Sequence, residues 1–382
     1  MTTQTQSQRE HFWDALRAFL MLLGIPYHVA LSYQPGQDFI VHSGEGVTGF
    51  SQFADALHLF RMPAFFVIAG YFAMLLLAKR EPMAWLKGRF LRLGIPFLTC
   101  ILTLVPAMNL VCELSNLPAP EALRSWRENS LTSGGYWVRH LWFIIVLLYL
   151  SSGTAFLAQR FPSVRSGLVP RSIDDWASRH FVLTLFGLAL MIGLWEALAL
   201  EAFYSLGLAS MLPQQILRLD ETIIYLPWFA LGCVLVRARL SLEQATRLSA
   251  PVALVAVAGT ALWLIVHKDV APMTERFIGT FAALAATQVL IAAARTLLDR
   301  QIPLVRKLTD ASFVIYLFHL PLIALFVWLA QPLPLPPVVK ALAIMALSFG
   351  LSYAIWGVIG RIRSMSLLFE GLTVPRRVPL AT

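Results

Sequence analysis

Ten stretches of this chain are apolar over lengths that can cross a lipid bilayer. A crossing takes roughly 17–25 residues of α-helix, because the hydrocarbon core is about 30 Å thick and the helix rises about 1.5 Å per residue. The bilayer core offers no water to unpaired backbone groups, so stretches of this length are expected to be helical. The predicted spans are 12–33, 55–78, 93–113, 138–158, 181–201, 220–236, 251–267, 277–298, 312–330 and 338–359.

Composition agrees with a membrane protein. Hydrophobic residues make up 58% of the 382 positions and charged residues only 13%, whereas a soluble domain is about a quarter charged. We therefore predict an all-α polytopic membrane protein, a bundle of about ten transmembrane helices that forms a single domain over residues 1–382. The formal net charge is +9, but the basic residues lie in short loops, as membrane topology requires, so nucleic-acid binding is not expected.

The basic residues also predict the orientation of the chain. Twenty Lys and Arg lie in one set of loops and five in the opposite set, so both termini should be cytoplasmic, which agrees with an even number of spans. The tails 1–11 and 360–382 would then be cytoplasmic, and the first span would be retained and not cleaved as a signal peptide. Two predicted spans, 220–236 and 251–267, are short, and 202–218 is apolar enough to be re-entrant or interfacial.

The first span carries a line of ionisable side chains. Arg17 and His28 are eleven residues apart, which is about 16.5 Å of rise and only about 20° of rotation on an ideal helix; Asp14 lies within about 60° of the same line. An ionisable group inside a membrane costs several kcal/mol unless it faces a wet or protein-lined interior, so these residues mark a candidate functional site. The alternative is a salt bridge that only orients the bundle. The helix-kinking Pro26 beside His28 favours the functional interpretation.

Further ionisable residues are predicted on the outer side of the membrane. His28 lies about 24 Å above the cytoplasmic end of its span. His58 and Arg61 follow the outer start of the second span, His140 begins the fourth, and Glu201 ends the fifth. Histidine titrates near neutrality, so the cluster suits general base chemistry on a hydroxyl, with His58, His140 and Glu201 as candidate substrate-binding residues. For His58 and His140 the alternative is an ordinary interfacial polar position.

No metal site is predicted from these histidines. Their spacing follows no zinc-ligand pattern, and no HExxH motif or cysteine pair accompanies them. Cys100, Cys112 and Cys233 are widely separated, and we expect them to be small buried residues.

The cytoplasmic start of the third span contains two arginines one turn apart, Arg89 and Arg92. They lie near the predicted depth of Arg17. Guanidinium groups bind phosphate through paired hydrogen bonds, so the three arginines are candidates to hold the phosphates of a cofactor. The alternative for a lone pair of this kind is ordinary topology-setting charge.

The ninth span carries a third set of polar residues. Ser312, Tyr316 and His319 are spaced by four and three, so they share one helix face, which we expect to point into the bundle. His319 is predicted to lie in the cytoplasmic half, too deep to pair with His28. Two roles remain open for these side chains: lining a donor tunnel, or hydrogen bonding to a neighbouring helix.

Four of these motifs resemble the integral-membrane acyltransferase-3 family. They are Arg17-X10-His28, the run from Phe60 to Gly70, Arg89-X2-Arg92 and the Ser312-to-His319 run. Each motif is weak alone, and the four in this order are specific. Within the family, the segments 9–28, 85–97 and 140–143 are most similar to the glucans biosynthesis protein C group. The resemblance extends over essentially the whole chain.

The resemblance implies an enzyme of the bacterial inner membrane. It would take an acyl group, succinyl in this group, from cytoplasmic acyl-CoA and place it on hydroxyls of osmoregulated periplasmic glucans. The catalytic histidine of the family would be His28, its partner Arg17, and the RxxR pair Arg89 and Arg92. No permanently bound cofactor is implied, since acyl-CoA is a substrate.

Elementary chemistry is compatible with this implied reaction. Basic residues would hold the nucleotide end of acyl-CoA while the pantetheine arm extends from the depth of Arg17 to that of His28. His28 would act as a general base on the acceptor hydroxyl, with a covalent acyl-histidine as the less favoured variant. Arg61, or a backbone amide freed by Pro26, is a candidate to stabilise the oxyanion.

Two other functions are considered. One is an O-acetyltransferase of another cell-surface carbohydrate, which the motifs do not distinguish. The other is a proton-coupled secondary transporter that uses Asp14, Arg17 and His28 as a relay. Transporters usually have paired halves with broken helices, and the sequence has no matching halves.

Overall fold

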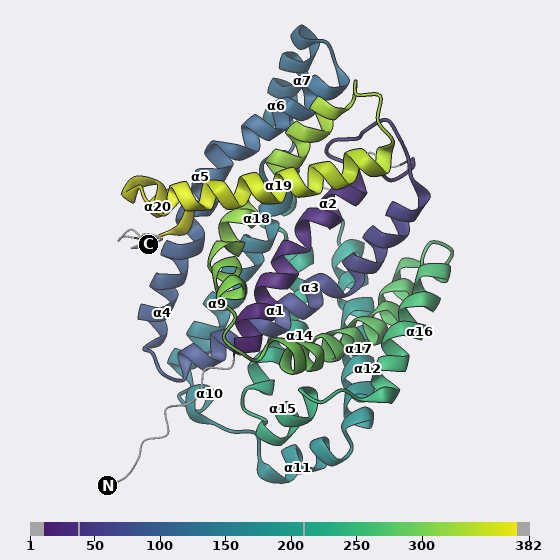
Figure 1. Ribbon diagram of the computed structural model, residues 1–382. Coiled ribbons are helices and arrows are strands. Elements are labelled where there is room, and N and C mark those ends of the chain that lie inside the picture. The colour runs from purple at the N-terminus through teal and green to yellow at the C-terminus, as the bar shows by residue number, and fades with distance from the viewer. Residues whose placement is uncertain (1–10, 37–38, 209–210, 373–382) are drawn as a thin grey trace.

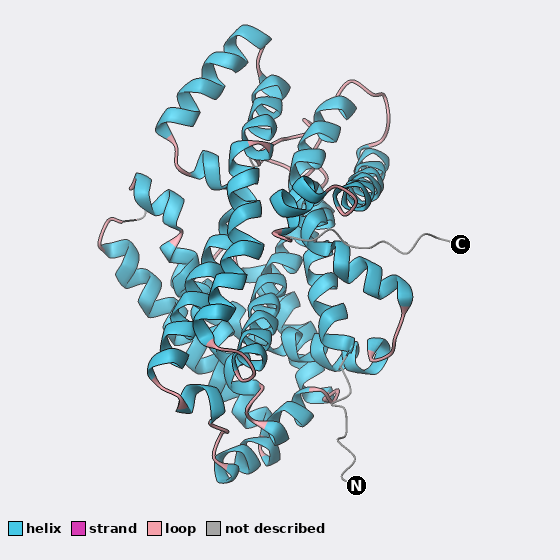
Figure 2. Ribbon diagram, turned by 90° about the vertical axis from the view of Figure 1, so that its left-hand side faces the viewer, coloured by secondary structure: helices cyan, strands magenta, loops and turns pink. Residues whose placement is uncertain are grey.

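The structure is a computed structural model that describes residues 11–36, 39–208 and 211–372. Within these ranges the chain consists of helices joined by turns and loops, with no strand (Figure 2). The predicted all-α class is therefore confirmed. Several long helices begin at a proline, for example Pro272, Pro303 and Pro337. Proline suits this position because its fixed φ fits the helix and its missing N–H would have had no partner there.

In the described part of the chain, eight helical segments are long and apolar enough to cross a membrane. They correspond to eight of the ten predicted spans, and some of them consist of consecutive helices. The segments are His11–Ser32 (α1, His11–Leu22; α2, Gly24–Ser32), Thr48–Leu77 (α3), Pro82–Asn116 (α4, Pro82–Arg89; η1, Phe90–Gly94; α5, Ile95–Leu102; α6, Leu104–Asn116), Gly135–Arg160 (α8, Gly135–Val138; η2, Arg139–Leu141; α9, Trp142–Arg160), Phe181–Ser205 (α12), Pro272–Leu298 (α17), Pro303–Ala330 (α18) and Pro337–Ile359 (α19).

The two short predicted spans are also helical. α14 (Leu219–Leu235) follows α13 (Leu212–Leu217), and together they bend by 112° into α15 (Arg239–Ala245), which gives a ninth span if the bent pair counts as one. α16 (Ala250–Val266) has 17 residues and is shorter than the eight. Each of the ten predicted stretches thus coincides with a helix, while length and composition alone support eight or nine spans.

The short helices lie at the ends of the bundle. α7 (Ala119–Thr132) projects at the top of Figure 1, whereas α11 (Arg171–Arg179) and α15 lie at the bottom, with α10 (Ser163–Ser166) nearby. The predicted C-terminal tail, 360–382, includes a helix, α20 (Arg363–Glu370), which packs against α5. Residues 1–10 and 373–382 lie outside the described residues.

Two turns at the ends of helices are held by carboxylates. Glu81 caps α4 by accepting hydrogen bonds from the N–H groups of Met83 and Ala84, and these bonds hold the pKa of Glu81 below its usual range. Asp174 joins α11 to α15. Although its burial opposes ionisation, hydrogen bonds from Leu240 and Ser241 lower the pKa of Asp174.

The closest helix contact in the bundle is between α3 and α14. A Cβ atom on Gly70 would lie 1.9 Å from the carbonyl oxygen of Phe229, and one on Gly232 would lie 1.9 Å from that of Val67. Small residues of this kind let helix backbones approach in a membrane, where van der Waals packing replaces the hydrophobic effect. Because α3 also contributes His58 and Arg61, this contact places part of the site described below.

We expect Gly70→Ala and Gly232→Ala to destabilise the protein, because each added methyl group would force the two backbones apart. Overpacking typically costs about 1–3 kcal/mol, so thermal unfolding in detergent, followed by differential scanning fluorimetry, should begin at a lower temperature. Gly153→Ala in α9 is the matched control, since no atom lies within 4 Å of its Cβ position. Equal unfolding temperatures for all three variants would contradict the close contact.

Candidate functional site

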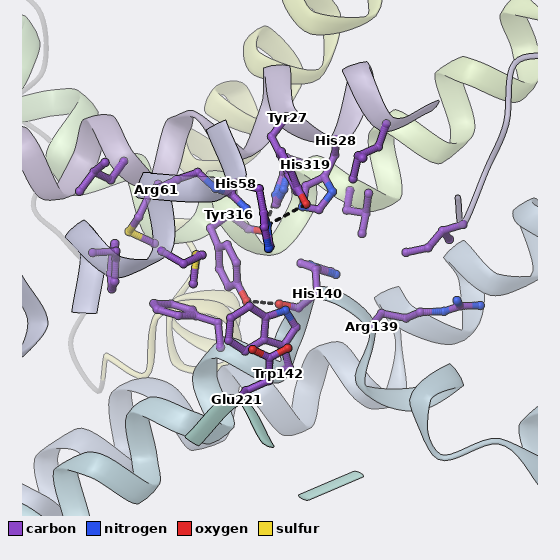
Figure 3. Close-up of a pocket in the computed structure, with 18 of the residues that line it drawn as sticks. Tyr27, His28, His58, Arg61, Arg139, His140, Trp142, Glu221, Tyr316 and His319 are labelled. Carbon is purple, nitrogen blue, oxygen red and sulfur yellow. Dashed lines mark hydrogen bonds between the residues drawn. The ribbon is translucent and has the colours of Figure 1, made fainter. Parts of the chain in front are cut away.

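A cavity of about 230 Å³ lies between α1, α2, α3, η2, α9, α14, α18 and the loop that follows α2. Its lining combines histidines, arginines and aromatic rings with apolar side chains, and Figure 3 shows how the polar ones face one another. The lining residues are Leu20, Met21, Tyr27, His28, Leu31, Phe39, Ile40, His58, Arg61, Met62, Phe65, Arg139, His140, Trp142, Phe143, Glu221, Tyr316, His319 and Leu320.

His28 reaches the cavity from α2, beyond a break in the first span. α1 ends at Leu22, and α2 begins at Gly24. Pro26 accounts for the break, since it has no N–H to donate to the carbonyl of Leu22, four residues earlier. The predicted kink at this proline is thus present, and Asp14 and Arg17 remain on α1 below it.

The imidazoles of His28 and His319 lie side by side, with ring centroids 5.2 Å apart. The prediction that His319 is too deep to meet His28 is therefore wrong. The predicted depth of His319 in the membrane is measured from residue 312, where the apolar span begins. The helix α18 begins earlier, at Pro303, sixteen residues before His319. Sixteen residues correspond to about 24 Å of rise, the same height that His28 reaches on its own span.

The tautomer of His319 is indicated by the hydrogen bond of its Nδ1. Nδ1 lies 2.6 Å from the carbonyl oxygen of Tyr316. A carbonyl oxygen only accepts, so Nδ1 carries the proton, and Nε2 of the neutral ring has a free lone pair. His319 Nε2 and His28 Nδ1 are both buried without a hydrogen-bond partner. These two nitrogens belong to neighbouring rings, but they are not hydrogen-bonded to each other.

His140 borders the same space from a strained turn. Its ring centroid lies 5.5 Å from that of His319, and neither of its ring nitrogens has a partner. The preceding residue, Arg139, has φ 45°, a conformation that costs a non-glycine residue of order 1–3 kcal/mol. The hydroxyl of Tyr316 donates to the carbonyl oxygen of His140 at 2.6 Å, and Arg139 Nε donates to Asn109 at 2.8 Å. These bonds hold the turn.

The more open side of the cavity is formed by His58, Tyr27 and Phe39. The side chain of His58 is exposed and hydrogen-bonds the hydroxyl of Tyr27 at 3.2 Å (Figure 3). Phe39 stacks on His28 with ring centroids 5.6 Å apart. Together these rings present an amphipathic surface next to His28.

Arg61 is the buried cation of the site. Its residue is 9% exposed, and its guanidinium carbon lies 4.3 Å from the centre of the Tyr27 ring. Gly24 makes room for it: a Cβ there would lie 3.2 Å from Arg61 Nη1 and 3.1 Å from His319 Nε2. The break after α1 therefore brings the backbone directly against both side chains.

Arg17, Arg89 and Arg92, which the sequence predicts to be cytoplasmic, form a cluster separate from the cavity. Arg17 pairs with Asp14 at 3.5 Å, and both Arg17 and Arg92 act electrostatically on Arg89. Arg89 ends α4 and Arg92 lies in the π-helical turn η1, a local distortion that is frequent at functional sites. None of the three lines the cavity, whose lowest residues on α1 are Leu20 and Met21. An apolar floor of about one turn separates the two parts of the site.

The residues predicted for the site differ in part from those that line the cavity. Glu201 is exposed on α12 and does not line the cavity, whereas Glu221 of α14 does. Ser312 is buried and donates to the carbonyl oxygen of Thr309 at 2.9 Å. Glu221 forms an ion pair with Arg218 and lies at the start of the predicted span 220–236. A carboxylate at the end of an apolar span is the sequence feature from which Glu221 could have been chosen as a candidate.

The described residues include no group of three or more His, Cys, Asp or Glu side chains arranged to hold a metal ion. The three cysteines are free thiols, of which Cys100 and Cys112 are buried and Cys233 is half-buried.

The sequence matches the family model described as an acyltransferase domain, acyltransferase 3, over residues 10–357. The chain belongs to the acyltransferase-3 family. Among curated proteins it is similar to glucans biosynthesis protein C of Escherichia coli K12 and to that of Escherichia coli O81, in each case 28% identical over 97% of both chains. No solved structure matches the chain. Family membership and the apolar helices together identify a multi-pass membrane acyltransferase.

Proposed function

We propose that the protein transfers an acyl group, succinyl, from cytoplasmic acyl-CoA to hydroxyls of osmoregulated periplasmic glucans. The observation that carries the proposal is the His28 imidazole, which lies in an internal cavity above a cluster of cytoplasmic arginines. The family supplies the reaction class, and the name of the E. coli relatives supplies the glucan. The inner membrane with both termini cytoplasmic is the location that gives access to both substrates.

The proposed chemistry is direct attack on the thioester. His28 takes the proton of the acceptor hydroxyl as the oxygen bonds to the acyl carbon, which gives a tetrahedral intermediate. Collapse of this intermediate breaks the carbon–sulfur bond, and the thiolate of CoA leaves with the proton returned by His28. A neutral His28 with Nδ1 protonated has its Nε2 lone pair available as the base. His319 Nε2 has no hydrogen-bond partner and belongs to a ring whose centroid lies 5.2 Å from that of His28. It is the proposed acceptor for the proton on His28 Nδ1, and such a bond would select this tautomer.

The donor is proposed to enter from the arginine cluster. Arg17, Arg89 and Arg92 are suited to bind the phosphates of CoA, because a guanidinium group pairs with phosphate through two hydrogen bonds. The thioester would pass the apolar floor at Leu20 and Met21 to reach His28, about 16.5 Å above Arg17. The proposed contacts of the acceptor are His58 on the open side of the cavity, the buried His140, and Glu221 in place of Glu201.

Replacement of His28 by Ala tests the proposal directly. A general base typically contributes about 10²–10⁴-fold, so glucans from cells that produce only this variant should carry almost no acyl ester. Anion exchange and mass spectrometry of released glucans measure the charge and mass of the added group. The matched control is His180→Ala, since His180 is an exposed histidine between α11 and α12. Glucans from cells that produce this variant should carry the normal amount of acyl ester. Normal acyl content with His28→Ala at equal protein levels would reject the role of His28.

His319 should act by positioning His28. In the proposed reaction His28 Nδ1 donates a hydrogen bond to His319 Nε2, a bond that the structure without substrates does not contain. His319→Leu removes this acceptor, and a hydrogen bond to a group that becomes charged contributes about 1.5–3 kcal/mol, so kcat should fall roughly 10–100-fold with little change in KM. His319→Gln retains an acceptor oxygen and should recover part of the rate. The double variant His28→Ala/His319→Leu should be no slower than His28→Ala. Equal rates for the Leu and Gln variants would show that the lone pair of His319 is unimportant.

The double variant Arg89→Ala/Arg92→Ala should bind acyl-CoA more weakly. Each hydrogen bond between charged groups contributes about 1.5–3 kcal/mol, so Kd should rise at least about tenfold, as measured by isothermal titration calorimetry in detergent. The control is Arg171→Ala, which removes an exposed basic residue at the start of α11, on the predicted cytoplasmic side, and should leave Kd unchanged. An unaltered Kd in the double variant would return both arginines to a topological role.

A further inference from the structure

Arg61 is a buried cation without a protein counter-ion. In the described part of the chain it forms no ion pair and no hydrogen bond, and its Nε is buried without a partner. Its one specific contact is with the face of the Tyr27 ring, 4.3 Å from the guanidinium carbon. A buried ion costs several kcal/mol unless another charge compensates it, so a guanidinium left in this state is poised for an anion from outside the protein.

The acidic side chains that face this region are already paired. Glu221, the one carboxylate among the described cavity residues, lies 2.5 Å from Arg218. Asp55, two turns from Arg61 on α3, lies 3.0 Å from Lys268 and 3.3 Å from His267. The groups around Arg61 itself are tyrosines and histidines, chiefly Tyr27, Tyr225, Tyr316, His28 and His319. None of these supplies a negative charge at neutral pH.

The position of Arg61 relative to His28 indicates which molecule would carry the anion. Arg61 Nη1 and His319 Nε2 both lie within 3.2 Å of the Cβ position of Gly24. His28 is four residues further along the same segment, which corresponds to about 6 Å of helical rise. Side chains four residues apart share a helix face, so Arg61 beside Gly24 and the His28 side chain lie about one helical turn apart, a spacing comparable to the length of an extended four-carbon diacid. A carbonyl attacked beside His28 would therefore place the far end of such an acyl chain at Arg61.

We propose that Arg61 forms an anion subsite that holds the distal carboxylate of a dicarboxylic acyl group during transfer. The inference rests on the proposed acyl transfer and deepens it, since it names the residue that selects a charged acyl group. Paired hydrogen bonds from the guanidinium to the carboxylate supply the recognition. A neutral acyl group leaves Arg61 unpaired, and a site whose buried polar groups are left unpaired discriminates strongly against that substrate.

The test compares two donors of equal carbon number, succinyl-CoA and butyryl-CoA, with the full-length protein in detergent and glucan as acceptor. The wild type should prefer succinyl-CoA by about 100-fold or more in kcat/KM. Arg61→Met should lose this preference by losing succinyl transfer while butyryl transfer persists, and Arg61→Lys should keep part of it. Arg139→Met, which removes the other arginine of the cavity lining, should leave the ratio between the donors unchanged.

The outcomes separate the inference from the proposed function. An equal loss of both donors in Arg61→Met would overturn the anion subsite and leave Arg61 as an oxyanion or structural residue. A wild type that transfers acetyl or butyryl groups as well as succinyl would also overturn it, although acyl transfer would stand. A wild type that transfers no acyl group would reject the proposed function itself. If Arg61→Met does not fold, free succinate should still raise the unfolding temperature of the wild type more than butyrate does, and equal shifts would overturn the subsite.

Discussion

Three helical segments meet at Gly24, and the arrangement of the site depends on that contact. A side chain at this position would lie 3.1 Å from His319 on α18 and 3.2 Å from Arg61 on α3. Because glycine has no Cβ, the backbone between α1 and α2 can approach both groups closely. Pro26 contributes the second requirement, since it interrupts the helix at Leu22 and separates the segment that carries His28 from the one that carries Arg17.

This arrangement accounts for polar side chains that would otherwise be costly in a membrane. His28, His140 and His319 can remain neutral, so their burial costs less than that of a permanent charge. Arg61 cannot deprotonate, and the Tyr27 ring compensates its charge only in part. The protein thus keeps unpaired donors and acceptors in one cavity. Hydrogen bonds to a substrate would compensate the desolvation free energy of these buried groups. Such a pattern is typical of a binding or catalytic site and not of helix packing.

The separation between the cavity and the arginine cluster has a consequence for the proposed mechanism. A tunnel open at both ends would let water and ions leak through the membrane, and the apolar side chains of Leu20 and Met21 lie on α1 between Arg17 and the cavity. In the proposed reaction only the narrow arm of the donor has to part these side chains. Methionine is well suited to such a boundary because its side chain is unbranched and flexible.

The helical class, the approximate spans and most polar residues of the site could be predicted from the amino-acid sequence. These follow from the length of apolar stretches and from the cost of placing an ionisable group within them, both of which are local properties. The predicted depth of His319 was wrong because residues 303–311, the first part of α18, include several polar side chains and were not counted with the apolar span that begins at 312. Tertiary structure alone decided that His319 and Arg61 meet at Gly24, and that Glu221 and not Glu201 faces the cavity. Those outcomes depend on how helices distant in sequence rotate and approach one another, which no periodicity within a single helix records.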